Sequence, residues 1–213
     1  MGSAGLFHPY DGTNGLTSCS KNLKANTFNI SWTASPTTSG AGVGFNGSTQ
    51  YGDTMFTPGG ATHYAQNNSC FGIWITAAGS STDFGMFSGA VNSGAWARIQ
   101  RSASTSAALR ANGTFDALVS VTWPSVAPGL ALAAIRTGSS AAASGVDGAY
   151  VGNGSASTGL PNASFYVGAE DNGGLFFPQT CTLGCDWAAS GMSSTDWTAF
   201  YNAVQTLMSG LGR

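Results

Sequence analysis

Few side chains in this sequence are suited to chemistry, and one short stretch brings three of them to the same side. In residues 95–100 (AWARIQ), a strand would place Trp96, Arg98 and Gln100 on one face, because successive side chains of a strand point to opposite faces. A planar ring beside guanidinium and amide donors suits the ring and hydroxyls of a sugar. The same spacing also fits a core tryptophan followed by an edge arginine whose aliphatic stem packs on apolar surface. We take these three residues as candidate ligand-binding residues, with that structural interpretation as the alternative.

The acidic residues favour binding over catalysis. Glycoside cleavage needs two carboxylates that face one bond, and a strand supplies them when two acids are two residues apart. Glu170 and Asp171 are adjacent instead, so on a strand they would point to opposite faces. We expect no catalytic residues and no enzymatic activity. Asp171 and Asn172, in a turn context, are further candidate ligand-binding residues.

No motif indicates a metal or a cofactor. The sequence lacks a GxxxxGK[ST] phosphate loop, a GxGxxG stretch that opens a helix after a strand, a GxSxG nucleophile elbow and an HExxH zinc motif. The histidines, His8 and His63, are far apart in the sequence. Acidic turns at Asp11, Asp53, Asp147 and Glu170-Asp171 could offer oxygen ligands to calcium, but none has the spacing of a calcium loop. Surface turns are the favoured interpretation, and we expect neither a metal nor a cofactor.

The four cysteines are predicted to be free or structural thiols. They are Cys19, Cys70, Cys181 and Cys185. Four cysteines allow three pairings, among which the sequence does not choose. On one extended strand, Cys181 and Cys185 would be about 13 Å apart, which is too far for a disulfide. A tight turn at Gly184 would bring them closer.

Composition excludes several classes of function. Only 8% of the 213 residues are charged, and the formal net charge is −2. Nucleic-acid binding needs clustered Lys and Arg, and only Arg98 and Arg101 come close together, so we expect no nucleic-acid partner. No apolar run approaches the roughly 20 residues that span a bilayer, so we expect no membrane insertion. The opening MGSAG lacks the charged and apolar regions of a secretory signal, so we expect no classical secretion.

Glycine-rich turns between short apolar stretches predict an all-β fold. The predicted strands are residues 28–34, 50–56, 70–76, 83–88, 95–101, 107–111, 115–123, 130–136, 148–151, 164–169 and 183–189. The dipeptides that suit the positive φ angles of hairpin turns are Asn46-Gly47, Asn112-Gly113, Asp147-Gly148 and Asn153-Gly154. In residues 115–123, Phe115, Val119 and Trp123 share one face and Asp116 and Ser120 the other. This alternation is typical of an antiparallel sheet with one buried face, and we expect a single antiparallel β-sandwich.

One helix is predicted near the C-terminus, over residues 194–208. Ser193 to Asp196 resembles a capping box, with a hydroxyl acceptor followed three residues later by an acid. Beyond it, apolar residues recur at i, i+3, i+4 and i+7. They are Trp197, Phe200, Tyr201, Val204, Leu207, Met208 and Leu211. This stripe predicts a helix that packs across the sandwich, with a partner-binding helix as the alternative.

Several stretches together resemble the concanavalin A-like (laminin-G-like) jelly-roll domains of tailed-phage and prophage virion proteins. They are residues 44–58 (GFNGSTQYGDTMFTP), 64–74 (YAQNNSCFGIW), 162–174 (NASFYVGAEDNGG) and 200–205 (FYNAVQ) within the predicted helix. The family carries a Y-x-D-T-x-F-x-P segment, a QNN strand entry, an F-Y-[IV]-G-A strand and a closing helix with [LF]-Y-N-A-[IV]-Q, in this order. The match covers residues 43–211. It divides the chain into an N-terminal segment, residues 1–42, which we expect to hold the first strands and the virion attachment, and the sandwich, residues 43–213.

The resemblance implies a virion surface protein that is assembled in the host cytoplasm and released by lysis. Its partners would be other virion proteins and a host surface polysaccharide, which it would bind as a fibre or spike tip. The alternative is a structural capsid or tail decoration protein that binds no sugar, and a depolymerase ranks last because paired acids are missing. By analogy with the symmetry of virion attachment points, we expect a homo-oligomer, with a trimer as the specific prediction.

Overall fold

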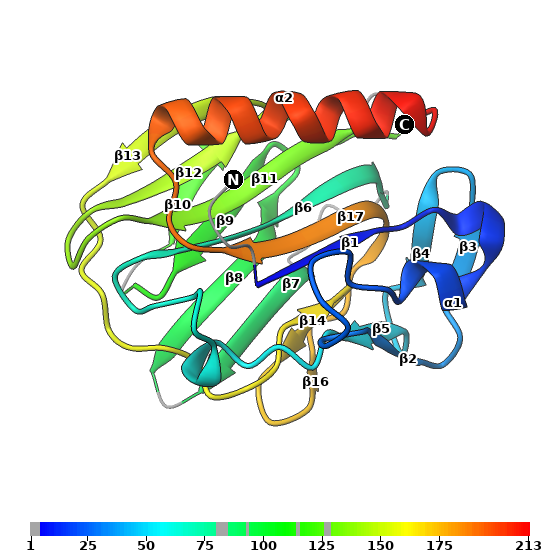
Figure 1. Cartoon of the computed structure of the whole chain (residues 1–213), viewed down its shortest axis with the longest axis horizontal. Helices are drawn as coiled ribbons and strands as arrows, with labels where there is room; N and C mark the ends of the chain where they lie inside the picture. The colour runs from blue at the N-terminus through cyan, green and yellow to red at the C-terminus, as the bar shows by residue number, and fades with distance from the viewer. Residues whose placement is uncertain (1–4, 80–84, 93, 114–115, 126–128) are drawn as a thin grey trace.

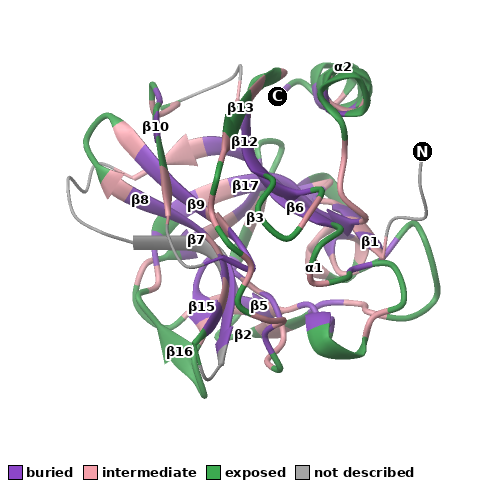
Figure 2. Ribbon diagram, turned by 90° about the vertical axis from the view of Figure 1, so that its left-hand side faces the viewer, coloured by how far each residue is buried: buried purple, intermediate pink, exposed green. Residues whose placement is uncertain are grey.

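The computed structural model describes residues 5–79, 85–92, 94–113, 116–125 and 129–213, which form three layers (Figure 1). Helix α2 (Ser194–Gly210) lies along the outer face of sheet A, and sheet B packs against the other face of sheet A (Figure 2). The predicted all-β sandwich with a C-terminal helix is therefore confirmed. Among the described residues, no helix is long and apolar enough to span a membrane.

Sheet A has the strand order β13-β12-β11-β6-β17-β4-β3, and β1 also pairs with β17. Its strands are β1 (Leu6–Pro9), β3 (Thr37–Ser39), β4 (Gly42–Asn46), β6 (Ser69–Ala78), β11 (Leu130–Arg136), β12 (Ala142–Val146), β13 (Ala149–Asn153) and β17 (Thr180–Ala189). The pairings within sheet A are antiparallel.

Sheet B has the order β10-β9-β8-β7-β14-β5-β2, with β15 and β16 attached beside β7. Its strands are β2 (Ser31–Thr33), β5 (Tyr51–Asp53), β7 (Gly85–Asn92), β8 (Ala95–Ala103), β9 (Ser106–Ala111), β10 (Ala117–Ser120), β14 (Tyr166–Val167), β15 (Glu170–Asp171) and β16 (Leu175–Phe176). Short helices α1 (Leu16–Cys19), η1 (Gly12–Asn14) and η2 (Pro58–Gly60) lie in the connections.

The layers explain two different burial patterns along the strands. The central strands of sheet A are buried on both faces, so β11 is buried at each position and reads as the apolar run LALAAIR. Strand β8 of sheet B alternates instead, with Ala97 and Ile99 in the core between the sheets and Trp96 and Arg98 half-buried on the other side. A continuous apolar strand therefore marks the middle layer, and an alternating strand marks the layer with one open face.

Helix α2 begins and packs as the sequence predicts, two residues longer than expected at its C-terminal end. The Ser193 side chain accepts from the Asp196 backbone N–H, and the Asp196 carboxylate accepts from the Ser193 backbone N–H, which completes the capping box. Trp197, buried under the helix, donates from Nε1 to the Ala149 carbonyl at 2.9 Å. The space for its ring comes from Gly145, where a Cβ would lie 2.5 Å from the indole. The helix thus closes a second apolar core on the outer face of sheet A.

A β-bulge in β17 divides that strand between the two cores. Leu183 pairs with Ile75 and Cys185 with Trp74, so Gly184 is an extra residue without a counterpart in β6. The bulge reverses which side chains face which layer. Cys181 and Leu183 lie in the core between the sheets, whereas Cys185 lies under α2. All four cysteines are free and buried, as predicted.

The segment before residue 43 contributes strands to both sheets. Strand β1 pairs with β17, β3 with β4 and β2 with β5. Each pairing joins a strand that ends at or before Ser39 to one that begins at Gly42 or later. The boundary at residue 42 therefore does not separate two structural units.

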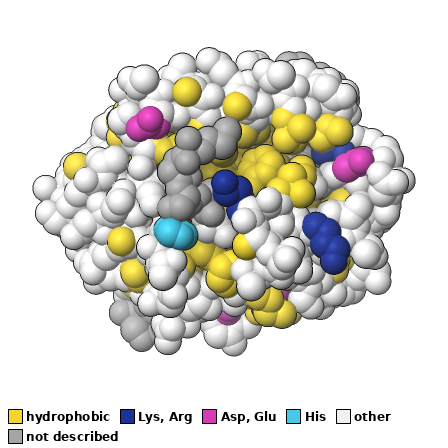
Figure 3. Space-filling model, in the orientation of Figure 1, with side chains coloured by type: hydrophobic (Ala, Val, Ile, Leu, Met, Phe, Trp, Pro, Cys, Tyr) yellow, Lys and Arg dark blue, Asp and Glu magenta, His cyan; other side chains and the backbone are white. Residues whose placement is uncertain are grey.

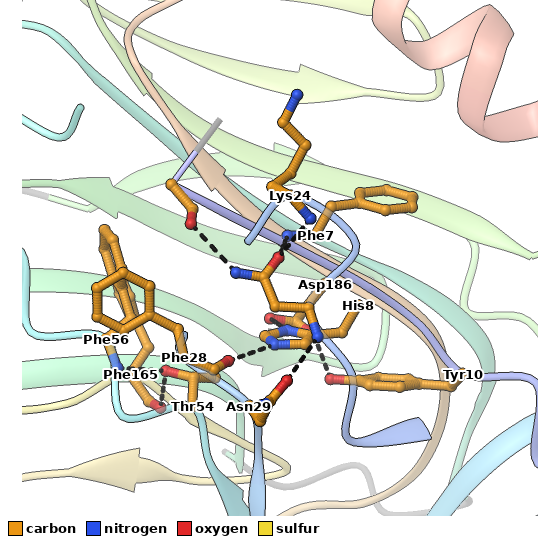
Figure 4. Close-up of polar contacts among 12 residues, drawn as sticks. Phe7, His8, Tyr10, Lys24, Phe28, Asn29, Thr54, Phe56, Phe165 and Asp186 are labelled. Atoms are coloured by element: carbon orange, nitrogen blue, oxygen red, sulfur yellow. Dashed lines mark hydrogen bonds and ion pairs between the residues drawn. The ribbon is translucent and has the colours of Figure 1, made fainter. Parts of the chain in front are cut away.

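A buried polar network fixes β1 against β17 (Figure 4). His8 Nδ1 lies 3.0 Å from the Asp186 carboxylate and its Nε2 lies 2.7 Å from the Phe28 carbonyl. Tyr10 also donates to Asp186. Because both ring nitrogens face acceptors, both must carry a proton. Burial alone would favour the neutral ring, but the charge and hydrogen bond of Asp186 outweigh burial and raise the pKa of His8.

Several predicted strands are shorter in the structure, for local backbone reasons. The strand predicted at residues 28–34 is reduced to β2, because Phe28 (φ 60°) and Ala34 (φ 55°) adopt left-handed conformations. The strand predicted at residues 50–56 ends at Asp53, since Met55 also has a positive φ of 55°. In residues 115–123 only β10 forms, and Phe115 lies outside the described residues.

The structure confirms the predicted turn at Asp147-Gly148, whereas the prediction at Asn153-Gly154 is wrong because neither residue has a positive φ. Asp147 (φ 44°) and Gly148 (φ 82°) connect β12 and β13, as expected for a two-residue turn with both φ angles positive. Gly47 (φ 70°) and Asn112 (φ 53°) are also left-handed. Six strands of the structure, β1, β3, β4, β12, β15 and β16, were not predicted from the sequence.

Candidate functional site

The outer face of sheet B, which α2 does not cover, carries the polar side chains that the sequence singles out. Trp96, Arg98 and Gln100 project from this face of β8, while Ala97 and Ile99 enter the core. The alternation along β8 keeps these three residues on one side of the strand, with Trp96 and Arg98 half-buried and Gln100 buried. The alternative of a core Trp96 beside an edge Arg98 is wrong, because Trp96 lies outside both cores and β8 lies between β7 and β9.

Strand register extends this face into a row across the sheet. Arg110 of β9 is directly opposite Arg98, and Arg98 is opposite Gly89 of β7. Gly89 is opposite Tyr166, which is opposite Asp53 of β5. Directly opposed residues of paired strands share a face. The row therefore places two guanidinium groups, a phenol ring and a carboxylate on one surface.

Asp116 holds the two arginines together. Arg98 donates from Nε and Nη2 to the two oxygens of Asp116, at 3.0 and 2.6 Å, and Arg110 Nε donates to Asp116 at 2.9 Å. Like charges directly opposite each other on a sheet repel, and the shared carboxylate offsets that repulsion. Burial favours the protonated acid, but hydrogen bonds and charge from Arg98 and Arg110 outweigh burial and lower the pKa of Asp116.

Trp96 forms the aromatic part of this arrangement. The guanidinium carbons of Arg98 and Arg110 lie over its ring, at 4.5 and 5.0 Å from the ring centroid. Such cation–π contacts fix both the ring and the arginines. We call Trp96, Arg98, Arg110, Asp116 and Glu170 the Trp96 cluster.

Glu170 completes the Trp96 cluster as a buried carboxylate. It is 0% exposed, and neither of its carboxylate oxygens has a hydrogen-bond partner among the described residues. It pairs with Gly89, and a Cβ at Gly89 would lie 3.2 Å from both Glu170 Cγ and Arg98 Cβ, so glycine makes room for both. Burial, partly offset by Arg98 and augmented by Asp116, raises the pKa of Glu170 to about 7. The carboxyl group thus changes charge near neutral pH.

A second aromatic group lies further along the same row. The rings of Tyr51 and Tyr166 stack with centroids 4.5 Å apart. Burial and then the Asp171 carboxylate raise the pKa of Tyr166. Both tyrosines are half-buried, so part of each remains in contact with solvent.

The other predicted site residues, Gln100, Asp171 and Asn172, are buried in the fold or form a turn. Gln100 is only 3% exposed, and no described residue forms a hydrogen bond with its Oε1 atom, so it does not reach the surface as the sugar-binding interpretation requires. Asp171 Oδ1 accepts from the backbone N–H groups of Gly173 and Gly174 at 3.1 and 3.2 Å. The Asn172 N–H donates to the Gly174 carbonyl at 3.2 Å. Asp171 and Asn172 therefore shape the turn between β15 and β16.

The acidic turns weighed as calcium ligands have similar roles. Asp11 caps η1 by accepting from Thr13 N, and Asp147 accepts from Ala131 N at 2.9 Å. Within the described part of the chain, no group of three or more His, Cys, Asp or Glu residues could hold a metal ion.

Sequence reasoning missed Arg110, Asp116 and the packing of Glu170. Arg110 and Asp116 join the Trp96 cluster through the pairing of β8 with β9 and the turn that follows, which sequence spacing alone does not reveal. The separation of Glu170 from Asp171 was anticipated, since adjacent residues on a strand point to opposite faces. The sequence feature that bears on the packing of Glu170 is Gly89, which leaves room for its side chain. That feature can be interpreted only when the pairing of β7 with β15 is known.

Comparison with known proteins defines the fold of this chain only. No protein-family model and no curated protein sequence matches it. Solved structures do match, among them a Trypanosoma rangeli sialidase in complex with sialic acid, with a TM-score of 0.64 and 11% identity over 97% of this chain. A mutant of that sialidase displaying trans-sialidase activity gives a TM-score of 0.66 at 12% identity over 95% of this chain.

A second group of similar structures comes from a toxin. The botulinum neurotoxin serotype D binding domain matches with a TM-score of 0.64 and 8% identity over 94% of this chain. The chain spans 33% of the sialidase chains and 52% of the toxin domain. These likenesses place the chain among β-sandwich domains of jelly-roll type.

Proposed function

We propose that this protein is a virion surface protein that binds a host surface polysaccharide through the outer face of sheet B. The observation that carries the proposal is the row of aromatic and charged side chains across that face, from Arg110 through Arg98 and Tyr166 to Asp53. Aromatic rings offer flat apolar faces to sugar rings, and the carboxylates and guanidinium groups beside them match sugar hydroxyls.

The comparisons and the sequence motifs support separate parts of the proposal. One similar structure was solved with sialic acid bound, and another is the binding domain of a toxin. The virion location rests on the resemblance of residues 43–211 to tailed-phage and prophage jelly-roll domains. The partners would then be other virion proteins in a homo-oligomer, for which we propose a trimer. Light scattering that gives the mass of a monomer, together with no trimer in the particle, would contradict the trimer.

We propose binding without catalysis. The two carboxylates of the Trp96 cluster differ in availability, because both oxygens of Asp116 already accept from Arg98 and Arg110. A glycosidase needs its second carboxylate free to act on water or on the sugar. Release of oligosaccharides from a bound polysaccharide by the purified protein would contradict this part of the proposal.

The first experiment is binding of the purified protein to intact host cells, with and without extracted host surface polysaccharide as competitor. We expect saturable binding that the polysaccharide abolishes. Tyr51→Ala and Tyr166→Ala should each weaken binding about tenfold, equivalent to about 1.4 kcal/mol. Tyr150→Ala on β13 of sheet A makes the same chemical change away from the site, and it should leave binding unchanged.

Two outcomes would argue against polysaccharide binding. No binding at micromolar concentration would favour a decoration subunit, and many copies on each particle would support that function. Equal losses in Tyr150→Ala and Tyr166→Ala would place the contact elsewhere or indicate a general loss of stability. Urea unfolding of each variant separates these two explanations.

A further inference from the structure

A groove lies on the opposite side of the molecule, between α2, strand β1 and the turn before the helix. Its volume is about 440 Å³, which lies in the range of small-molecule pockets. Its floor contains Trp187 and Val204, and Phe7, Phe200 and Leu207 contribute to its sides. Hydrophobic side chains gather below α2 in the space-filling view, with a basic side chain at their border (Figure 3).

The helix keeps this groove open with small side chains. Ala199 and Ala203 line it from α2, at positions one helical turn apart. Larger side chains at these two positions would extend into the groove and reduce its volume. The groove is therefore a part of the α2 interface that no described side chain fills.

Lys24 supplies the one positive charge among the described residues that line the groove. Its side chain extends past Phe7 toward α2, and its ammonium group forms no ion pair with the described residues (Figure 4). The acidic residue of the lining, Asp196, is already committed to the capping box with Ser193. The unpaired charge of the groove is thus positive and lies at one end.

The backbone around the groove offers no strand edge to a peptide. The Phe7 N–H donates to Asn22 Oδ1 at 3.0 Å, and the Phe7 carbonyl accepts from Leu23 N at 2.9 Å. The Gly191 N–H donates to Asn68 Oδ1 at 2.8 Å. A peptide main chain entering the groove would lose water without gaining these hydrogen bonds, which is costly. An aliphatic chain has no such groups to satisfy.

We propose that this groove binds a free fatty acid, with its alkyl chain over Trp187 and Val204 and its carboxylate beside the Lys24 ammonium. The apolar floor removes the chain from water, which is the main source of binding free energy. The positive charge of Lys24 favours a negatively charged head group. This site is independent of the outer face of sheet B, so either proposal can fail without the other.

The test is calorimetric titration of the whole protein with dodecanoate below its micelle concentration. We expect one saturable site, with weaker binding at high salt because the ion pair is exposed. Lys24→Gln should weaken binding about two- to fivefold, as expected for an exposed ion pair. Lys21→Gln, three residues earlier and outside the lining, is the matched control and should bind as the unmodified protein does.

Ala203→Trp should abolish binding, because the indole would fill the groove. If this variant does not fold by circular dichroism, Ala199→Leu makes a smaller change on the same wall and should weaken binding. Dodecyltrimethylammonium, with the same chain and a cationic head, should bind more weakly than dodecanoate. Absence of dodecanoate binding, equal binding of the two amphiphiles, or full binding by a folded Ala203→Trp variant would each overturn the proposal.

Discussion

The outer faces of the two sheets carry different kinds of side chain, although alternate residues point outward from the strands of both. On sheet A, the outward side chains include Trp74 and Trp187, which α2 covers together with its own Trp197. On sheet B, the outward side chains include Arg98, Arg110 and Tyr166, and no described helix covers them. One outer face extends the core, and the other assembles charges around an aromatic ring.

The outer face of sheet A contributes to the stability of the fold, whereas we assign a binding role to the outer face of sheet B. Apolar burial under α2 stabilises the fold through area removed from water. Glu170 has the opposite effect, because a fully buried carboxylate with no hydrogen-bond partner in the described part of the chain is costly when ionised. Buried ionisable groups that have shifted pKa values and lie near other charges are typical of functional sites.

Trp197→Ala should destabilise the protein by about 3–5 kcal/mol, because it removes a fully buried ring and leaves a cavity. Urea unfolding followed by circular dichroism measures the loss. Leu207→Ala is the control on the same helix, since Leu207 is 38% exposed and should cost less than about 1 kcal/mol. Similar effects of the two changes would mean that α2 does not close a core on sheet A.

Glu170→Gln should stabilise the protein at pH 8, by up to about 3 kcal/mol. The folded pKa of about 7 lies above the ordinary value of 4.5. Stability therefore falls as the pH rises from about 4.5 to about 7, and the full cost of the charge is present above that range. The gain from Glu170→Gln should nearly vanish at pH 4. Urea unfolding at both pH values checks this sign, and a loss of stability at pH 8 would contradict it.

Asp116→Asn should destabilise the protein by about 2 kcal/mol, because it removes charged hydrogen bonds to Arg98 and Arg110 and leaves their repulsion. It should also lower the pKa of Glu170, since Asp116 contributes to raising it. Arg110→Gln in the same background should recover part of the loss by relieving the repulsion. The double-mutant cycle in urea measures the coupling, and additive effects would exclude it.

His8 adds a separate pH dependence inside the sandwich. Its raised folded pKa lies above the ordinary value of 6.5. Its contribution is therefore complete below about pH 6.5 and is lost as the pH rises through the folded pKa, at up to about 1.4 kcal/mol per pH unit. His8→Gln should flatten this decline while leaving the decline due to Glu170. A His8→Gln protein with an unchanged slope above pH 6.5 would show that the ring is neutral.

The regular parts of the fold could be predicted from the sequence because local pattern and tertiary role agree. The alternation in residues 95–101 predicted β8 and its outward face, and the capping box at Ser193 predicted the start of α2. Strand β12 (AASGV) was missed, because its alanine, serine and glycine resemble a loop. Those small residues are needed where the ring of Trp197 lies against Gly145, and only the packed structure reveals that need.

The candidate site could be predicted only in part, for the same kind of reason. Trp96 and Arg98 lie on one strand, so their common face follows from a period of two. Asp116, which lies just before β10, and Glu170 on β15 reach Arg98 through strand register and through the missing side chain of Gly89. Gln100 shares the face of Trp96 but is buried there, which the period of two does not reveal.

The extra residue at Gly184 places natural chemical probes in different layers. Cys181 lies between the sheets and Cys185 beneath α2, and both are buried thiols with raised pKa values. A thiol reagent can reach Cys185 once the helix detaches, whereas Cys181 requires the sheets to separate. The rates of labelling at these two positions, followed by mass spectrometry, would therefore time the detachment of the helix and the opening of the sandwich independently in the unmodified protein.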